Sequence, residues 1–182
     1  MINIEENIKI KDLEFSPFVT RFDILERVKE LAIQINQDYE GKNPVFIAVL
    51  NGSFMFASDL LKQVDIRSEL TFIKVNSYEG TSSTNQIKEM IGLSQNITDR
   101  HVIVIEDIVD TGHTMNYLLQ ELNKKDPSSI EVATLFHKPQ ANKSNIRLKY
   151  VGFDIPNLFI VGYGLDYDGI GRNYQDVYQL ND

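Results

Sequence analysis

The residues of this sequence most able to do chemistry lie close together, in the stretch V-I-V-I-E-D-I-V-D-T-G-H-T-M at positions 102–115. Four apolar residues there meet two adjacent acids, Glu106 and Asp107, and a third acid, Asp110, follows three residues later. An acid buried at the end of a strand is costly unless it is paired or binds a ligand. Vicinal hydroxyls of a ribose, with or without a magnesium ion, would suit two carboxylates at a strand tip. For any one of these acids, a polar strand end or a helix N-cap is the ordinary alternative.

The four residues after Asp110 could bind an anion. Thr111, Gly112, His113 and Thr114 lead into a predicted helix, so backbone N–H groups and hydroxyls would gather at its positive end. The glycine would let an anion approach the backbone closely. Plain N-capping by a threonine is the ordinary alternative. Taken together, the strand, the acid pair, the third acid and the T-G-x-T loop describe a seat for a ribose 5-phosphate.

The elements that must position these residues alternate between strand and helix. The hydrophobic pattern predicts helices at 21–39, 54–62 and 114–124, and strands at 45–50, 70–78, 101–108 and 130–138. Segment 79–92 indicates an exposed mobile loop that could close in a short hairpin, and β-rich pieces follow at 149–156, 158–167 and 169–180. This alternation predicts a parallel α/β sheet with right-handed crossovers. Ligands of such sheets bind beyond the carboxyl ends of the strands, where the acids lie.

Composition narrows the class of protein. The chain has 182 residues, of which 42% are hydrophobic and 24% charged, as expected for one soluble globular domain. No apolar stretch approaches the roughly 20 residues of a membrane span, and the acidic, interrupted N-terminus does not suit a signal peptide, so we expect a cytoplasmic protein with no membrane partner. The absence of cysteine excludes disulfides, thiolate metal sites and cysteine nucleophiles. A net charge of −8 argues against a nucleic-acid partner.

The stretch 102–115 resembles the phosphoribosyl pyrophosphate (PRPP) signature of the type I phosphoribosyltransferases, and its E-D-I-V-D-T-G form resembles the branch that acts on 6-oxopurines. Further segments match the family in order: A-V-L-N-G-S-F-M-F at 48–56, N-S-Y at 76–78, F-H-K-P at 136–139, V-G-F-D-I-P at 151–156 and V-G-Y-G-L-D-Y at 161–167. The resemblance implies an α/β fold with a mostly parallel central sheet flanked by helices, and a small hood built from chain-terminal segments. It implies a single domain over 1–182, with a core at about 21–150 and the hood at about 1–20 and 151–182.

The same resemblance implies an activity. Enzymes of this branch transfer the 5-phosphoribosyl group of PRPP to hypoxanthine, and to guanine, giving IMP or GMP and pyrophosphate in purine salvage. Mg²⁺ would be the cofactor, and a homo-oligomer, either dimer or tetramer, would be the assembly. Two other classes stay open: a PRPP-binding regulatory protein without transferase activity, and an α/β nucleotide-binding domain of unrelated activity whose three acids hold magnesium alone.

The resemblance also implies a role for each matching residue. Asp110 would accept the proton of the purine ring nitrogen, as the catalytic base. Ribose and its 5′-phosphate would be held by Glu106, Asp107, Thr111, Gly112, His113 and Thr114. Pyrophosphate would be held by Leu50, Asn51, Gly52, Ser77, Tyr78 and Arg172, with a non-proline cis peptide between Leu50 and Asn51. The purine would be held by Lys138, Phe159, Ile160 and Asp166, and the metal by Glu106, Asp107 and Asp166.

The chain departs from the family at two positions. Some relatives carry Lys where this sequence has Asn51 and His113, so there is less fixed positive charge on its phosphate sites. His137, beside Lys138, is given a structural role only.

Overall fold

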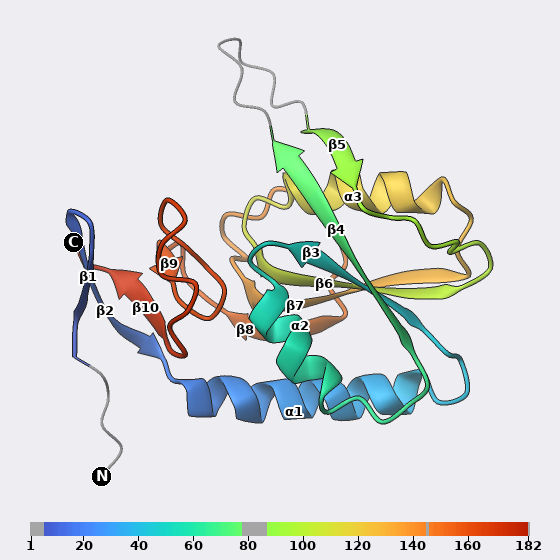
Figure 1. The fold of residues 1–182 in the computed structure, drawn as a ribbon, viewed down its shortest axis with the longest axis horizontal. Coiled ribbons are helices and arrows are strands. Elements are labelled where there is room, and N and C mark those ends of the chain that lie inside the picture. Colours follow the sequence, from blue (N-terminus) through green and yellow to red (C-terminus); the bar gives the residue numbers. More distant parts are fainter. Residues whose placement is uncertain (1–5, 78–86, 145, 182) are drawn as a thin grey trace.

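Two β-sheets of unequal size organise the molecule, and the first and last strands of the chain belong to the smaller one (Figure 1). The computed structural model describes residues 6–77, 87–144 and 146–181. The larger sheet carries the segments in which the sequence places most of the chemistry.

The larger sheet has six strands in the order β5-β4-β3-β6-β7-β8. Their bounds are β3 Val45–Leu50, β4 Glu69–Ser77, β5 Ile87–Ile91, β6 His101–Val109, β7 Ser129–His137 and β8 Tyr150–Asp154. Neighbouring strands from β4 to β8 are parallel, and only β5 is antiparallel, to β4. The predicted parallel α/β sheet is therefore confirmed, and the predicted strand at 45–50 coincides with β3.

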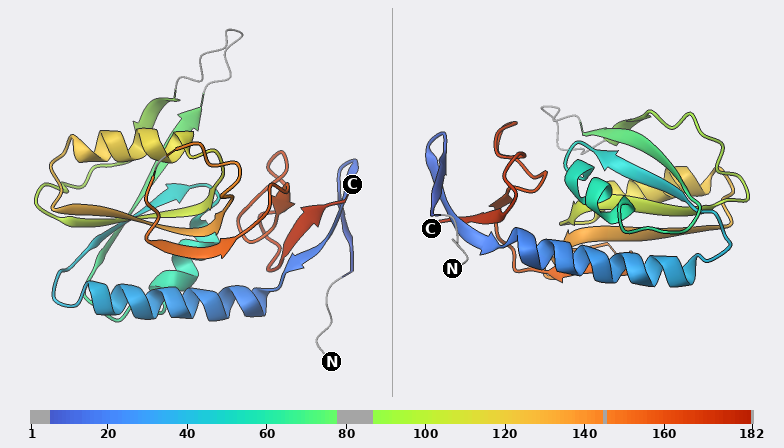
Figure 2. Two further views of the ribbon diagram at one scale, coloured as in Figure 1. Left: turned by 180° about the vertical axis from the view of Figure 1, so that it is seen from behind. Right: turned by 60° about the horizontal axis from the view of Figure 1, so that its bottom comes forward.

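Three helices cover the two faces of this sheet (Figure 2). They are α1 Arg21–Asp38, α2 Phe54–Leu61 and α3 His113–Asn123. On β3, Phe46 and Ala48 pack into the hydrophobic cluster of α1 and α2, whereas Val45 and Ile47 pack into the cluster of α3. Because both faces are covered, every second residue meets one layer and the strand reads as a continuous apolar run.

The smaller sheet is antiparallel, in the order β1-β2-β10-β9. Its strands are β1 Ile8–Ile10, β2 Leu13–Val19, β9 Ile160–Val161 and β10 Val177–Leu180. The prediction of a β-rich piece over 158–167 was wrong in extent, since only β9 is a strand there. Gly162 and Gly164, with φ of 99° and 100°, turn the chain back immediately after β9. The N-terminal strands β1 and β2 were not predicted from the hydrophobic pattern.

One hydrophobic cluster joins the segments beside the smaller sheet to the larger sheet. Ile155, Ile160 and Tyr163 belong to the same buried cluster as α1 and α2. The hydroxyl of Tyr163 donates to Asp59 Oδ2 of α2 at 2.6 Å, and burial raises the pKa of this tyrosine above its usual value. The turn that follows β9 is thus fixed against the helix that follows β3.

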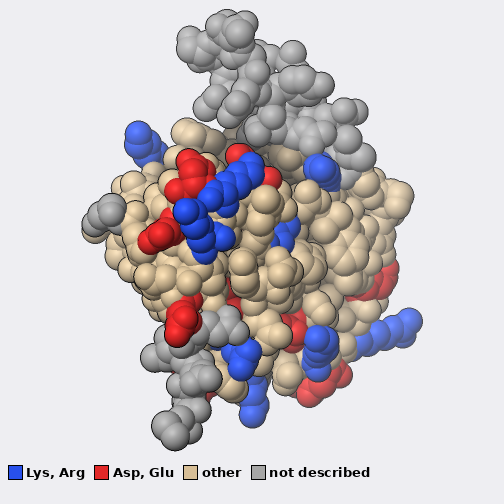
Figure 3. All heavy atoms as spheres, turned by 60° about the vertical axis from the view of Figure 1, so that its left-hand side comes forward, with Lys and Arg blue, Asp and Glu red and all other residues tan. Residues whose placement is uncertain are grey.

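Charges of both signs are interspersed on the side of the molecule that carries the smaller sheet (Figure 3). Lys11, in the turn between β1 and β2, pairs with Asp168 at 2.8 Å. Within the described part of the chain, no helix has the length and apolar character needed to cross a membrane.

The turn at Gly164 provides a test of how the two sheets are joined. A Cβ at Gly164 would lie 2.0 Å from the carbonyl oxygen of Gly52, and its φ of +100° already disfavours a side chain. We expect Gly164→Ala to lower the free energy of unfolding for two reasons. A side chain in the left-handed region costs about 1–2 kcal/mol, and overpacking against Gly52 costs about a further 1–3 kcal/mol. Gly41→Ala is the matched control, because Gly41 has a φ of +72° with no atom within 4 Å of the added Cβ. Urea unfolding measures both, and an equal loss in the two variants would contradict this packing.

Candidate functional site

The carboxyl ends of β6, β7 and β8 lie side by side and define the site. The parallel register aligns Val109 of β6 with His137 of β7, and His137 with Asp154 of β8. Glu106 and Asp107 lie in the C-terminal half of β6, and Asp110 is the first residue after the strand. Residues from three neighbouring strands therefore meet at one edge, as the sequence predicts for a parallel sheet.

The acid pair in β6 concentrates negative charge. Within the described residues, neither Glu106 nor Asp107 takes part in an ion pair. Asp107 Oδ1 accepts a hydrogen bond from the backbone N–H of Ile108 at 2.8 Å. Burial, and then the charge of Asp107, raise the pKa of Glu106 well above its usual value. Such a pair can accept hydrogen bonds from hydroxyl groups or bind a cation, because either would offset the repulsion between the two carboxylates.

The loop after β3 packs directly on this acid pair. A Cβ at Gly52 would lie 1.5 Å from Asp107 Oδ2, so only glycine fits between the loop and the carboxylate. The preceding Leu50–Asn51 peptide bond is cis, as the resemblance implies. Buried Ser53 donates from Oγ to the carbonyl of Val49 at 2.6 Å and closes the loop. The backbone of this loop at Gly52 thus lies against the carboxylate of Asp107, and the neighbouring Asn51 is exposed.

A cavity of about 100 Å³ lies where β6 leads into α3. It is lined by Glu106, Ile108, Val109, Asp110, Thr111, Gly112, Thr114 and Met115. Its volume is well below the roughly 300–1,000 Å³ of sites for drug-sized ligands. Gly112, with a φ of 78°, precedes the first residue of α3, so the free N–H groups of that helix begin here. A phosphate-sized anion fits these donors and the neighbouring hydroxyls. His113 is exposed and is not among the lining residues.

The third acid has a basic partner that the first two lack. Lys138 Nζ lies 2.7 Å from Asp110 Oδ2, and the lysine is only 7% exposed. The backbone N–H of Lys138 donates to the carbonyl of Val109 at 3.0 Å, which fixes the end of β7 against β6. A buried ammonium must be paired. Asp110 and Lys138 therefore form a donor and acceptor couple beside the phosphate-sized cavity.

Arg172 is tied to the turn that touches Gly52. Its Nη1 donates to the carbonyl of Gly164 at 2.6 Å, and its Nη2 lies 2.6 Å from Asp166 Oδ1. The other carboxylate oxygen of Asp166 accepts from the backbone N–H of Gly169 at 2.6 Å. Both oxygens of Asp166 are thus occupied by protein partners, whereas the hydrogen bonds of Glu106 and Asp107 among the described residues involve Oε1 and Oδ1 alone.

The remaining predicted residues are dispersed. Phe159 is 45% exposed next to β9 and meets the ring of Tyr167 edge-on, with 6.0 Å between centroids. Ile160 is buried in β9, and Ser77 is the last residue of β4. Tyr78 lies outside the described residues. Within the described part of the chain, no contact places Phe159 or Ile160 against the cavity, and the ligand roles of all four residues stay predictions.

Two residues near the site were missed by sequence reasoning. A Cβ at Gly112 would lie 2.0 Å from Ser144 Oγ and 2.7 Å from Asn142 Oδ1, so both side chains pack behind the phosphate-sized cavity. The signal was present as N-K-S at 142–144, because an Asn side chain readily accepts from the backbone N–H two residues on. That pattern marks a turn but not what the turn supports.

A metal ion would find two protein carboxylates here. Among the described residues, no three His, Asp or Glu side chains gather closely enough to form a metal centre of their own. Mg²⁺ commonly uses one or two carboxylates together with substrate phosphates and waters, and the unpaired Glu106 and Asp107 fit that mode of binding.

Comparison with known proteins extends these observations. A family model described as the phosphoribosyl transferase domain matches residues 21–168. A hypoxanthine-guanine phosphoribosyltransferase of Streptococcus thermophilus is 45% identical over 152 residues, which are 83% of this chain and 84% of the relative. One of Streptococcus mutans is 39% identical over 175 residues, 96% of this chain and 92% of the relative.

Solved structures agree. A hypoxanthine phosphoribosyltransferase of Staphylococcus aureus superposes with a TM-score of 0.84 and 39% identity, covering 94% of this chain and 93% of the other. One of Trypanosoma cruzi, solved in a study of how its C-terminal region affects oligomeric state and activity, superposes with a TM-score of 0.86 and 35% identity, covering 96% and 95%.

The raised pKa of Glu106 predicts how stability depends on pH. The unfolded chain ionises this residue near the ordinary value of 4.5, whereas the folded protein disfavours its charge. The stability contributed by the neutral form is therefore lost as pH rises above 4.5 and through the raised pKa. In the absence of divalent cations, we expect Glu106→Gln to melt at a higher temperature than the unaltered chain at pH 8, with the difference shrinking toward pH 4.

Thermal unfolding at a series of pH values makes the measurement, with exposed Glu40→Gln as the control. A Glu106→Gln variant that is no more stable than the unaltered chain at pH 8 would show that the charge is not strained.

Proposed function

This chain belongs to the phosphoribosyl transferase domain family, and from that premise we infer that it transfers the 5-phosphoribosyl group of PRPP to hypoxanthine and guanine, giving IMP or GMP and pyrophosphate. Hypoxanthine-guanine phosphoribosyltransferases at 39–45% identity over most of the chain support this reaction. The observation that carries it furthest is the buried Lys138 paired with Asp110 beside the cavity. A PRPP-binding regulator would need the phosphate seat but not this couple, and nothing found favours that alternative.

The cavity beside α3 is the proposed seat of the 5′-phosphate. Thr111, Gly112, His113 and Thr114 would supply hydroxyls and backbone N–H groups at the positive end of α3. His113 would contribute through its backbone, because its side chain is exposed and away from the lining. The acids Glu106 and Asp107 would accept from the ribose hydroxyls.

The loop after β3 is the proposed pyrophosphate site. Leu50, Asn51 and Gly52 would donate through the backbone, which the contact between Gly52 and Asp107 brings to the ribose end of the substrate. Ser77, the last residue of β4, would join them, as would Tyr78. Arg172 would reach the pyrophosphate by exchanging its ion pair with Asp166 for the phosphate oxygens.

Magnesium would be held by Glu106 and Asp107 together with substrate oxygens. When bound, it would neutralise the charge of the leaving pyrophosphate. Asp166 could become a further ligand once Arg172 turns to pyrophosphate, because their ion pair now occupies one of its oxygens.

The ends of β6 and β7 would select the base. Asp110 would accept the proton of the purine ring nitrogen. The ammonium of Lys138, which now donates to Asp110, would donate to the 6-oxo group instead. An exocyclic amine at that position cannot accept from an ammonium, so adenine would leave the buried lysine unpaired. Phe159 would stack on the ring, and Ile160 would offer its backbone to the base edge.

The transition state of this transfer is oxocarbenium-like at C1 of the ribose. Its positive charge would be stabilised by the carboxylates of β6 and by the phosphates held in fixed positions, so positioning and electrostatics would supply most of the acceleration.

We also propose that the chain acts as one domain and assembles as a homo-oligomer. The shared hydrophobic cluster supports the single domain. On the face of the sheet that α1 and α2 cover, β4 is left open: Leu70 and Phe72 are 41% and 42% exposed beside buried Phe46 and Ala48 of β3. A second copy seated on this apolar strip would bury it. Sedimentation velocity of the unaltered chain decides between monomer and oligomer.

Base preference tests the proposed reaction. With PRPP and Mg²⁺, we expect pyrophosphate release with hypoxanthine or guanine and none above background with adenine, because Lys138 requires an acceptor at position 6. A coupled pyrophosphate assay with each base, including xanthine, measures this. Absence of turnover with all three 6-oxopurines would rule out the transferase activity and favour the PRPP-binding regulator.

The role of Asp110 has a separate test. Asp110→Asn removes the proton acceptor, so we expect kcat to fall by about 10²–10⁴-fold, the usual worth of general acid–base catalysis. The KM for PRPP should change little, because the phosphate seat and acid pair are intact. Steady-state kinetics measures both constants, with exposed Asp99→Asn, two residues before the start of β6, as the control. If PRPP binding weakened as much as kcat, Asp110 would be a ligand of PRPP instead.

A further inference from the structure

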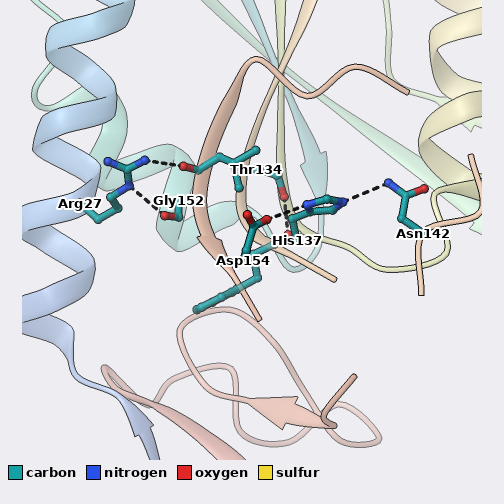
Figure 4. A network of polar contacts seen from close by, with 8 residues as sticks. Arg27, Thr134, His137, Asn142, Gly152 and Asp154 are labelled. Atoms are coloured by element: carbon teal, nitrogen blue, oxygen red, sulfur yellow. Dashed lines mark hydrogen bonds and ion pairs between the residues drawn. The ribbon is translucent and has the colours of Figure 1, made fainter. Parts of the chain in front are cut away.

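A chain of three polar side chains links the ends of β7 and β8 to the turn that follows Lys138 (Figure 4). His137 Nδ1 lies 2.8 Å from Asp154 Oδ1, and His137 Nε2 lies 3.1 Å from Asn142 Nδ2. His137 is largely buried, with a side-chain exposure of 18%, whereas Asp154 is exposed. The proposed transfer reaction assigns no role to any of these three residues.

The direction of the hydrogen bonds is fixed from both ends of this chain. Asn142 Oδ1 accepts from the backbone N–H of Ser144 at 2.9 Å, and a backbone N–H can only donate. The Asn142 amide nitrogen must therefore face His137, and Nε2 must accept from it. At the other end the carboxylate of Asp154 can only accept, so His137 Nδ1 carries the proton. One tautomer of the ring and one orientation of the amide satisfy every partner.

The hydrogen-bonded series Asp154–His137–Asn142 ends directly behind the phosphate loop, residues 110–114. Ser144 Oγ donates to Asn142 Oδ1 at 2.6 Å, and both atoms lie within 2.7 Å of where a Cβ of Gly112 would be. The backbone N–H of Lys143 also donates to the carbonyl of Thr111 at 3.2 Å. The position of the loop backbone is therefore set from behind by the turn at 142–144.

The other end of this hydrogen-bonded series, at Asp154, lies on β8, which is fixed against α1. Arg27 of α1 donates from Nε to the carbonyl of Gly152 and from Nη2 to that of Val151, each at 2.8 Å (Figure 4). The backbone N–H of Ile155 donates to the carbonyl of His137 at 2.8 Å. His137 is thus held by the sheet, and it in turn holds Asn142.

We propose that His137 is a positioning residue for the 5′-phosphate of PRPP: through Asn142 and Ser144 it holds the phosphate loop in the conformation that binds the anion. This rests on the proposed function, because it assumes that the cavity beside α3 takes that phosphate. Lys138, the next residue, reaches Asp110 on the base side. His137, the last residue of β7, and Lys138, which follows it, would therefore serve opposite ends of the substrate.

Two substitutions at His137 separate its two hydrogen bonds. An asparagine amide reaches about as far as Nδ1 and can keep Asp154, whereas a glutamine amide reaches about as far as Nε2 and can keep Asn142. We expect His137→Asn to raise the KM for PRPP roughly 3- to 10-fold, the worth of one hydrogen bond, and His137→Gln to restore it to within about 2-fold. In both variants kcat and the KM for hypoxanthine should stay within about 2-fold, because the base side is untouched.

A second pair of variants tests the route through the turn. Asn142→Ala should raise the KM for PRPP by the same factor as His137→Asn, and the double variant should raise it no further, because both break one chain. Gln140→Ala, exposed in the same turn, is the matched control. Asn142→Ala also carries the test by itself if the substitutions at His137 do not fold, as judged by circular dichroism.

Three results would overturn the proposal. The KM for PRPP could be unchanged in His137→Asn and Asn142→Ala, or the effects of the two substitutions could add in the double variant. In the third result, kcat would fall and the KM for hypoxanthine would rise by as much as the KM for PRPP rises. The unaltered chain is assayed beside them. Its failure to turn over any 6-oxopurine would count against the proposed function, whereas the ratio of KM values between variants counts only for or against His137.

Discussion

The geometry of the candidate site depends on a close approach of backbone at Gly52. On one side Gly52 meets the carboxylate of Asp107, and on the other its carbonyl meets Gly164, at distances that exclude a Cβ on either glycine. These contacts bring the loop after β3, the acid pair of β6 and the turn after β9 into one place. Each segment comes from a different part of the sequence, so two missing methyl groups decide whether the segments can form one site.

Electrostatics then divides the acids of this site into two kinds. Asp110 and Asp166 have basic partners, Lys138 and Arg172, at 2.7 and 2.6 Å. Glu106 and Asp107 have none among the described residues, and the pKa of Glu106 is raised as a result of burial and of its neighbour. Unpaired charge destabilises the folded chain, so the position where it persists is the position where a ligand would gain most by binding. Paired acids can instead exchange their partner when a ligand arrives.

The sequence specified the central sheet well and the periphery poorly, for physical reasons. Strand β3 is a continuous apolar run because both faces are covered, and that pattern is visible without a structure. The stretch 158–167 is also rich in β-forming residues, yet only β9 forms, because positive φ at Gly162 and Gly164 turns the chain. Asn142 was missed because its importance comes from a contact with Gly112, 30 residues earlier in the chain, which no local pattern encodes.

The end of β7 shows how one strand can serve two parts of a site. His137 is the last residue of β7 and Lys138 is the next residue, whose backbone N–H donates to the carbonyl of Val109. Lys138 reaches Asp110, while the preceding His137 reaches Asn142 and the turn behind Gly112. A shift of this strand end along its axis would disturb both, but a change in either side chain acts on one side alone. Recognition of the base and support of the phosphate loop can therefore vary separately, although the two side chains are attached to consecutive residues at the end of β7.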